Sequence, residues 1–583
     1  MRTANRGPYL LLTRLFLRQF LENDLLSPDG DRSQMLAIVG AAVISLTLFI
    51  SMFTSAGYAM SIMMPGEAAV LTLSDKFLYV SLAMLVTALV AAAQWDALTI
   101  DYRDAVILQP LPIRPAVLRL AKLTAVAALG AGVAIAVNVF PALIFPWMLA
   151  FAVPQMAAWQ VLQMLLTQFV IAVGAATFGF LAVIAIREWA SALLGANLFA
   201  RVSPWIQTIA IVLIGSAILL LPLVSTRVGQ RGLTGWRAVL PSTAFMGAYE
   251  SATGGFLVDL PRRRMTQRQA DRDRAFTEIY EQRRPMFAPL ARRAEALLGG
   301  VALLVLIATA LNAFRTPSIS VASAQARGRS KIAFLARLVF PRSAAGRAGF
   351  DFGLAILWRN KTHRLTLAAA AAIGFAMVLV AISGVDLAAD ARPTARLLSI
   401  QPLLYGCLLV AFRHVLRIPA ELRANWGIQI AWQGKARAFA NGVRAAAMLS
   451  IALPAILVVL PPVAFAAGLT FAAAHALLGI AGAAIVLETL MLSYDKVPFT
   501  CTYLPTDNMR AMAPLYALAF LIGAALFARF ELGILTGAYS RAGVAFLAAT
   551  FIALRIAGAF RRRVADIDFN ETPVTLQNLG LYS

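Results

Sequence analysis

Side chains that could catalyse a reaction or bind a metal are few and scattered in this chain. His363, His414 and His475 form no H-E-x-x-H pattern, and the two cysteines, Cys407 and Cys501, form neither a disulfide framework nor a metal-ligand cluster. The sequence contains no G-x-x-x-x-G-K-[ST] loop for nucleotide phosphates and no G-x-S-x-G nucleophile motif. We therefore expect no enzymatic activity, no metal and no cofactor in this chain itself.

Glu488, in the run AIVLETLML, is the clearest acidic residue within an apolar segment long enough to span a membrane. An ionisable group in hydrocarbon is costly, which makes this residue a candidate polar site. Contact with a substrate or an ion is one interpretation. Pairing with Lys496 near the end of the span is the other, because long side chains can reach the interface. A proton-coupled transporter should hold several carboxylates or histidines near mid-membrane, so a single candidate argues against that class.

A second kind of candidate site lies in DYRDAVILQPLPIRPAVLRLAKL, residues 101–123, between two apolar runs. Arg103 and Asp104 offer charged contacts to another protein, and Leu111 offers an apolar anchor. Prolines fix backbone angles and prevent one continuous helix; those of the segment are Pro110, Pro112 and Pro115. The segment is therefore either a docking surface of defined shape or a cytoplasmic loop in which prolines end helices.

The elements that position these residues are membrane helices. The chain is 60% hydrophobic and 14% charged, with a mean hydropathy of +0.76, whereas soluble domains carry about 25% charged residues. Apolar runs of about 20 residues recur without the alternation of a barrel, which predicts an all-α polytopic membrane protein. The twelve predicted spans lie near residues 36–56, 77–95, 120–147, 159–186, 204–225, 295–314, 365–385, 398–415, 443–468, 472–493, 512–530 and 538–559.

A net charge of +23 raises nucleic-acid binding as an alternative, but the basic residues gather at the ends of spans. Residues 315–364 hold ten basic side chains and one acid, as expected for a cytoplasmic flank beside anionic lipid. The basic flanks therefore indicate that both termini lie in the cytoplasm, which an even number of spans permits, and nucleic acid is not an expected partner. The predicted spans place the arginine-rich loop 226–293 outside the cell, which conflicts with the positive-inside bias. Long loops follow this bias only weakly.

The chain contains an internal repeat. The regions after the second and the eighth predicted span, which begin DYRDAV and ELRANW, each open with an acid and an arginine and end with a basic residue, Lys122 or Arg444, at the start of a long span. Arg103 and Arg423 are 320 residues apart, and the surrounding spans match in order. This pattern predicts two parallel six-helix halves, 1–320 and 321–583, because an even number of spans returns the chain to the same side.

Each half begins with an amphipathic, aromatic-rich segment, at 9–26 and 350–364. In the first segment, Leu12, Phe16 and Phe20 recur at helical spacing opposite Arg14 and Arg18. The pattern is typical of a helix that lies in the membrane interface. Anchoring the fold to the lipid headgroups would by itself explain such a helix.

The order of these elements resembles that of the permease subunits of type-2 ABC exporters, over nearly the whole chain. The strongest local part of the resemblance is RDAVILQPLPIRPAVLRLAKL, in which Leu111, Pro112 and Ile113 precede a basic residue. In that family the equivalent segment is a coupling helix that docks into a groove on the ATPase subunit. The segment 240–256 is similar in position to the re-entrant or surface helices that the family carries before its sixth span. The second half departs from the pattern, because it lacks the Leu-Pro-Ile sequence and has few residues between its last two spans.

The resemblance implies a permease that forms the substrate pathway of an ATP-driven exporter in the cell inner (plasma) membrane, with coupling segments at 101–119 and 421–441. The residues expected to contact the ATPase are Arg103, Asp104, Leu111, Pro112, Ile113, Arg423 and Trp426. Two copies of a partner subunit would bind ATP and Mg²⁺, and membrane lipids would surround the chain. An ion-coupled secondary transporter and a non-transporting membrane scaffold are the alternatives. Lipids, hydrophobic drugs, peptides and glycan carriers are equally compatible substrates.

Overall fold

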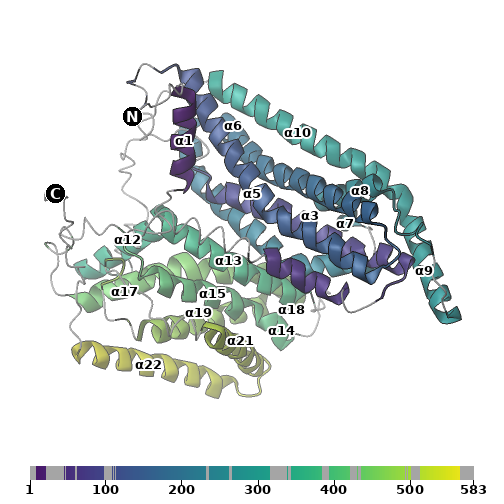
Figure 1. Ribbon diagram of the computed structural model, residues 1–583. Coiled ribbons are helices and arrows are strands. Elements are labelled where there is room, and N and C mark those ends of the chain that lie inside the picture. Colours follow the sequence, from purple (N-terminus) through teal and green to yellow (C-terminus); the bar gives the residue numbers. More distant parts are fainter. Residues whose placement is uncertain are drawn as a thin grey trace, which may run out of the picture. The chain divides into compact units, whose positions relative to one another are not determined.

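The protein is an all-α, multi-pass membrane protein (Figure 1). The computed structural model describes residues 8–21, 45, 47–58, 62–96, 108, 110–111, 113–231, 235–261, 266–314, 338, 340, 343–383, 393–420, 428, 430, 435–492, 494, 497–500 and 513–564. Within these ranges there are helices but no strands, and 11 helices are long and apolar enough to cross a membrane. They coincide in order with the second to twelfth predicted spans. Of the first predicted span, residues 47–56 are described as part of a helix that continues to residue 58.

The chain divides into two compact units, Met1–Ala324 and Gln325–Ser583. The predicted division at 320/321 lies close to this boundary. Each unit has its own buried apolar core, so each is described separately below.

Unit 1 consists of nine described elements. They are α1 (Pro8–Leu21), α3 (Pro65–Ala93), α5 (Pro115–Ala152), α6 (Ala158–Arg231), α7 (Trp236–Val239), α8 (Pro241–Thr253), α9 (Gln267–Arg283), η1 (Arg284–Met286) and α10 (Phe287–Phe314). Helix α3 is the most enclosed spanning helix and packs against α5, α6, α8 and α9. Gly195 has φ +70° and ψ 165°, a conformation that suits glycine, and it divides α6 into two spanning helices.

The arginine-rich segment 226–293, expected as an outer loop, is mostly helical in the described residues. It contains the end of α6, the helices α7, α8 and α9, and the start of α10. The main-chain N–H of Gly66 donates to Asp273 Oδ1 over 2.8 Å, and that of Met63 donates to the oxygen of Ala152 over 2.8 Å. These bonds place α9, the start of α3 and the end of α5 at one end of the unit. The predicted coupling segment follows the opposite end of α3, so the two segments are attached to opposite ends of this helix.

Unit 2 consists of ten described elements. They are α12 (Ala344–Arg359), α13 (Lys361–Ile382), α14 (Ala395–Leu398), α15 (Ile400–Val415), α17 (Ala436–Ala447), the π-helical turn η3 (Met448–Ala452), α18 (Leu453–Ala467), α19 (Leu469–Leu492), α21 (Ala513–Leu535) and α22 (Ser540–Val564). Helix α15 lies at the centre, where it packs against α13, α18, α19 and α21. Its buried face contributes Tyr405, Leu409 and Phe412 to the core.

Several predicted boundaries differ from the structure. The interfacial segment predicted at 9–26 is described as the helix Pro8–Leu21, and the second predicted span begins at Pro65, not at 77. The segment predicted at 350–364 crosses a real break, because α12 ends at Arg359 and α13 begins at Lys361. Asn360 separates the two helices: its side-chain oxygen accepts from the N–H of Thr362 over 3.0 Å and thereby caps α13.

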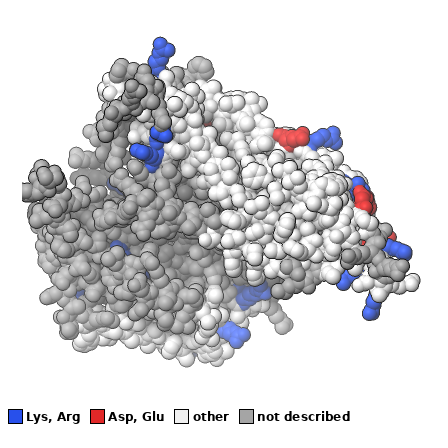
Figure 2. Space-filling view, viewed as in Figure 1, with Lys and Arg blue, Asp and Glu red and all other residues white. Residues whose placement is uncertain are grey.

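Charged side chains are unevenly distributed over the described surface of unit 1. Figure 2 shows a broad uncharged area over its spanning helices, with blue and red side chains gathered near α9. Large apolar side chains are exposed on these spans, including Leu143, Trp147 and Leu213. An apolar belt of this kind is what a hydrocarbon environment requires of helices that cross it.

Candidate functional site

The predicted coupling residues are described only in part. Leu111 is exposed and Ile113 is half-buried, and the N–H of Ile113 donates to the oxygen of Leu111 over 2.7 Å. Arg103, Asp104, Pro112, Arg423 and Trp426 lie outside the described residues. The structure therefore describes the residues at the ends of the two predicted coupling segments, and most of the charged residues within these segments lie outside the described ranges.

The first coupling segment follows Trp95, which is completely buried at the end of α3. Arg187, from the fourth span, donates from Nε to the main-chain oxygen of Trp95 over 2.8 Å. The indole N–H of Trp95 donates to Ser203 Oγ over 2.8 Å, at the start of the fifth span. The end of α3 is thus fixed to both halves of α6, on either side of the Gly195 break.

A buried ion pair holds Arg187 in place. Its Nη1 donates to Glu188 Oε1 over 2.6 Å, and both side chains are nearly inaccessible to solvent. Asn312, at the end of α10, donates from Nδ2 to Glu188 Oε2 over 2.8 Å. We call Trp95, Arg187, Glu188, Ser203 and Asn312 the first clamp. It joins the ends of α3, the two parts of α6 and α10, so a displacement of Trp95 would act on all of them.

Unit 2 has an equivalent attachment before its own coupling segment. The main-chain oxygen of Leu416, just after α15, accepts from the hydroxyl of Tyr494 over 2.9 Å and from the N–H of Phe499 over 3.0 Å. Arg413 donates from Nε to the oxygen of Leu490 over 2.9 Å and lies over the Tyr494 ring. His363 contacts the oxygen of Ile418 over 3.0 Å. We call Arg413, Leu416, Tyr494 and Phe499 the second clamp.

The two clamps share one geometry. In each unit, a main-chain oxygen just after the second span accepts a hydrogen bond from a residue at or just after the end of the fourth span. In unit 1 the donor is the guanidinium of Arg187. In unit 2 the donors are the phenol of Tyr494 and the main-chain N–H of Phe499, and Arg413 of α15 donates in the opposite direction, to the oxygen of Leu490 on α19. Side-chain donors to buried main-chain carbonyls stabilise that contact and fix the direction in which the chain leaves the helix.

The far end of each coupling segment is also held in the same way (Figure 1). Helix α1 packs against α5, where Lys122 Nζ lies 4.4 Å from the centre of the Phe16 ring and Tyr9 OH is 2.7 Å from Thr124 Oγ1. Helix α12 packs against α17 so closely that a Cβ atom on Gly349 would lie 2.1 Å from the main-chain oxygen of Phe439. An amphipathic helix therefore braces the start of the third span in both units.

Glu488 is buried near the end of α19, where it pairs with two arginines. Lys496, the partner considered from the sequence, lies outside the described residues. Its Oε1 lies 2.9 Å from Arg555 Nη1 and 3.7 Å from Arg444 Nε. Arg444 also donates to Asn441 over 2.9 Å. The residue that the sequence singled out thus joins α17, α19 and α22, and its charge is balanced within unit 2.

Sequence reasoning missed two further buried polar pairs, one of them an ion pair, because they lie at the margins of predicted spans. Lys76 Nζ contacts Glu250 Oε1 over 2.5 Å, and Tyr280 donates to Glu250 Oε2 over 2.6 Å, which joins α3 to α8 and α9. Burial, together with the adjacent Glu250, raises the pKa of Tyr249 well above its ordinary value, so this phenol stays neutral. His475 Nδ1 lies 2.6 Å from Glu531 Oε1, between α19 and α21.

No group of three or more His, Cys, Asp or Glu side chains suited to a metal occurs among the described residues. No protein-family model matches the chain, and no curated protein or solved structure is similar to it. The candidate site consists of the two clamps and of the helices α1 and α12, which pack against the spans that follow the predicted coupling segments.

Proposed function

We propose that this chain is the permease subunit of an ATP-driven exporter of the type-2 ABC kind, with two permease halves fused and the ATPase supplied by separate subunits. The observation that carries the proposal is the repetition of the clamp. In both units the residues that lead into the predicted coupling segment are bonded to the end of the fourth span. A scaffold would not require this attachment twice at the same topological position.

The attachment suits the transmission of force. A coupling segment has to move the helices that line a pathway when its partner changes shape, so its ends must be stiffly joined to them. Main-chain bonds at Trp95 and Leu416 join one end of each segment to α6 and α19, and helices α1 and α12 brace the other end. Buried charged donors make such joints stronger than neutral ones.

The remaining features of the proposal follow from the sequence. The coupling segments face the cytoplasm with both termini, and the protein resides in the inner (plasma) membrane in contact with anionic lipid. Two copies of a P-loop ATPase bind ATP and Mg²⁺ and dock on residues 101–119 and 421–441. Arg103, Asp104, Leu111 and Arg423 supply contacts to these partners, and nucleic acid takes no part.

Purification of the full chain from native membranes in mild detergent tests this proposal. We expect a P-loop protein to co-purify at about two copies per chain, and we expect the combined substitution of Arg103→Ala and Arg423→Ala to release it. The double variant Arg541→Ala and Arg201→Ala is the matched control, since it removes two exposed arginines outside the predicted coupling segments. A chain that always purifies alone would refute the proposal.

One observation favours an ion-coupled transporter as a second candidate. His475 and Glu531 form a buried, titratable pair between two spanning helices, which the exporter proposal does not use. Uptake or export by the purified chain in liposomes with a proton gradient and no ATP would support it. In that case Glu531→Gln should abolish the gradient-driven flux and leave insertion and folding intact.

A further inference from the structure

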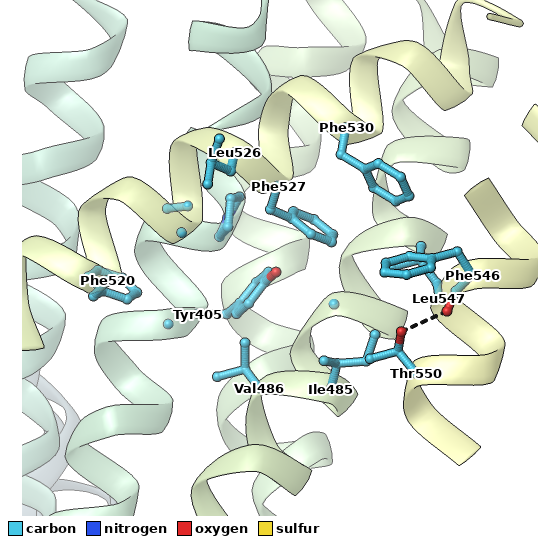
Figure 3. A pocket seen from close by; sticks show the side chains of 15 residues that line it. Tyr405, Ile485, Val486, Phe520, Leu526, Phe527, Phe530, Phe546, Leu547 and Thr550 are labelled. Atoms are coloured by element: carbon cyan, nitrogen blue, oxygen red, sulfur yellow. Dashed lines mark hydrogen bonds between the residues drawn. The ribbon is translucent and has the colours of Figure 1, made fainter. Parts of the chain in front are cut away.

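Unit 2 contains a cavity that neither the clamps nor the ion pairs use. It has a volume of about 420 Å³ and lies between α15, α19, α21 and α22 (Figure 3). Rings of Phe520, Phe527, Phe530 and Phe546 surround it, and Tyr405 and Thr550 supply the hydroxyls. The Thr550 hydroxyl is already engaged, because it donates to the main-chain oxygen of Phe546 over 2.8 Å. The volume is that of a ligand pocket, and the lining suits a hydrocarbon group.

The cavity is continuous with the outer surface of unit 2. Leu526 and Phe546 both line it, and each is 61% exposed. Neighbouring residues of α21 and α22, such as Ile522 and Ile552, are exposed apolar side chains on membrane-spanning helices. A molecule that enters between these helices therefore comes from the hydrocarbon of the bilayer.

A positively charged group lies next to one end of this cavity. On α19, Ile485 lines the cavity and Glu488 lies about one turn beyond it. On α22, Thr550 lines the cavity and Arg555 lies five residues further, about 7.5 Å along the helix axis. Arg444 and Arg555 both pair with the carboxylate of Glu488, so these three side chains carry a formal net charge of +1. The Arg555 side chain is 40% exposed, which leaves room for an anion beside its guanidinium.

We propose that unit 2 binds an anionic glycerophospholipid, with an acyl chain in the cavity between α15, α19, α21 and α22 and its phosphate beside Arg555. A phosphate pairs well with a planar guanidinium, and basic groups at the ends of membrane helices are suited to anionic headgroups. The positions along the helices fit as well. Glu488 and Arg555 lie nearer the C-terminal ends of α19 and α22 than the residues of these helices that line the apolar cavity. The inference does not depend on the transport proposal.

Gly523 allows the cavity to be filled without disturbing the fold. It lines the cavity, and a Cβ atom added to it would meet no other atom within 4 Å. The variant Gly523→Leu therefore places its side chain in open space and gains helix propensity. Gly300→Leu is the matched control, because Gly300 is a glycine on α10 with equally open surroundings and no part in the cavity.

Native mass spectrometry of the purified full chain, supplied with phosphatidylglycerol or phosphatidylcholine of identical acyl chains, tests the proposal. We expect the wild type and Gly300→Leu to retain phosphatidylglycerol with about a tenfold preference. Gly523→Leu should lose retention of both lipids. Arg555→Gln should keep lipid but lose the preference, and Arg541→Gln, at the other end of α22, should behave as wild type.

Phosphatidylglycerol with a photoactivatable diazirine on its acyl chain provides a second readout that needs no variant. We expect the label on peptides of α21 and α22 from the wild-type chain. Equal retention by the wild type and Gly523→Leu, or labelling confined to other helices, would overturn the proposal. A wild-type dimer that Gly523→Leu converts to monomers would overturn it too, since the cavity would then receive a second copy of the chain.

Discussion

Arg187 donates from Nε to the main-chain oxygen of Trp95 over 2.8 Å, and this bond joins the fourth span to the end of the second. The two residues are 92 positions apart in the sequence, and both are buried. The bond matters because the predicted coupling segment begins just after Trp95. If the segment couples to a partner as proposed, this bond is one of the contacts by which a displacement of the segment would reach α6.

Arg187→Gln is expected to weaken this joint without preventing insertion. The variant leaves Glu188 buried without its guanidinium, and loss of one partner of a buried pair costs about 3 to 5 kcal/mol. We expect a lower midpoint of thermal unfolding in detergent. We also expect faster hydrogen exchange in peptides that contain Trp95, because the local clamp opens more often.

Arg201→Gln is the control for the first clamp, because Arg201 lies on the same helix but is exposed. It should leave both the unfolding midpoint and the exchange of the Trp95 peptides unchanged. If Arg187→Gln and Arg201→Gln behave alike, the clamp does not hold the end of α3.

Lys76 and Glu250 provide a prediction for the opposite end of unit 1. Lys76→Met leaves a buried carboxylate whose remaining hydrogen-bond partner among the described residues is Tyr280, so it should destabilise the fold by about 3 to 5 kcal/mol. The double variant Lys76→Met and Glu250→Gln removes both charges and keeps an acceptor for Tyr280. It should recover much of the loss, as measured by equilibrium unfolding in mixed micelles.

The pair of Arg272 and Glu67, in which the arginine is exposed and the carboxylate is half-buried, is the control for that measurement. The Arg272 side chain is 65% exposed, so Arg272→Gln should change the free energy of unfolding by no more than about 1 kcal/mol. Additive effects of the two substitutions at Lys76 and Glu250 would show that these residues do not interact, and would contradict the structure.

The all-α membrane fold could be predicted from the sequence because hydrocarbon imposes a simple rule. A run of about 20 apolar residues has to be a helix, so composition and length are enough to identify a span. The start of α3 could not be predicted, since Asp75 and Lys76 interrupt the apolar run and hydropathy therefore places the boundary after them. In the structure Tyr58 donates to Asp75 and Lys76 meets Glu250, so both charges lie within the helix.

The candidate site could be predicted only in its outline. The spacing of the coupling segments follows from the repeat, but their attachment depends on contacts between distant residues. Nothing in the sequence near Trp95 indicates that Arg187 and Ser203 will bond to it, because the pairing is made by packing α3 against α6. Likewise the sequence identifies Glu488 as an unusual charge, whereas its partner Arg555 lies 67 residues later in the chain, on α22.

Glu488→Gln separates the two interpretations of this residue. If its role is to balance Arg444 and Arg555, the variant should lose about 1.5 to 3 kcal/mol of stability, the value of a hydrogen bond to a charged group. The double variant Glu488→Gln and Arg555→Gln should then regain part of that loss. A variant that unfolds like the wild type but fails to transport would instead indicate contact with a substrate or an ion.

The close packing of α12 against α17 gives the last prediction. Gly349→Ala would bring its Cβ atom to 2.1 Å from the main-chain oxygen of Phe439, and main-chain atoms can yield only if the two helices separate. Overpacking of this kind costs about 1 to 3 kcal/mol, and it should loosen the brace at the start of the third span of unit 2. Gly353→Ala is the matched control on the same helix, because its Cβ atom would meet Ala446 and Val443 at an ordinary 3.5 Å. We therefore expect a lower unfolding midpoint for Gly349→Ala alone and, if the proposed ATPase partner exists, weaker co-purification of that partner. Equal behaviour of the two variants would mean that α12 does not brace α17, and that the second coupling segment is held at one end only.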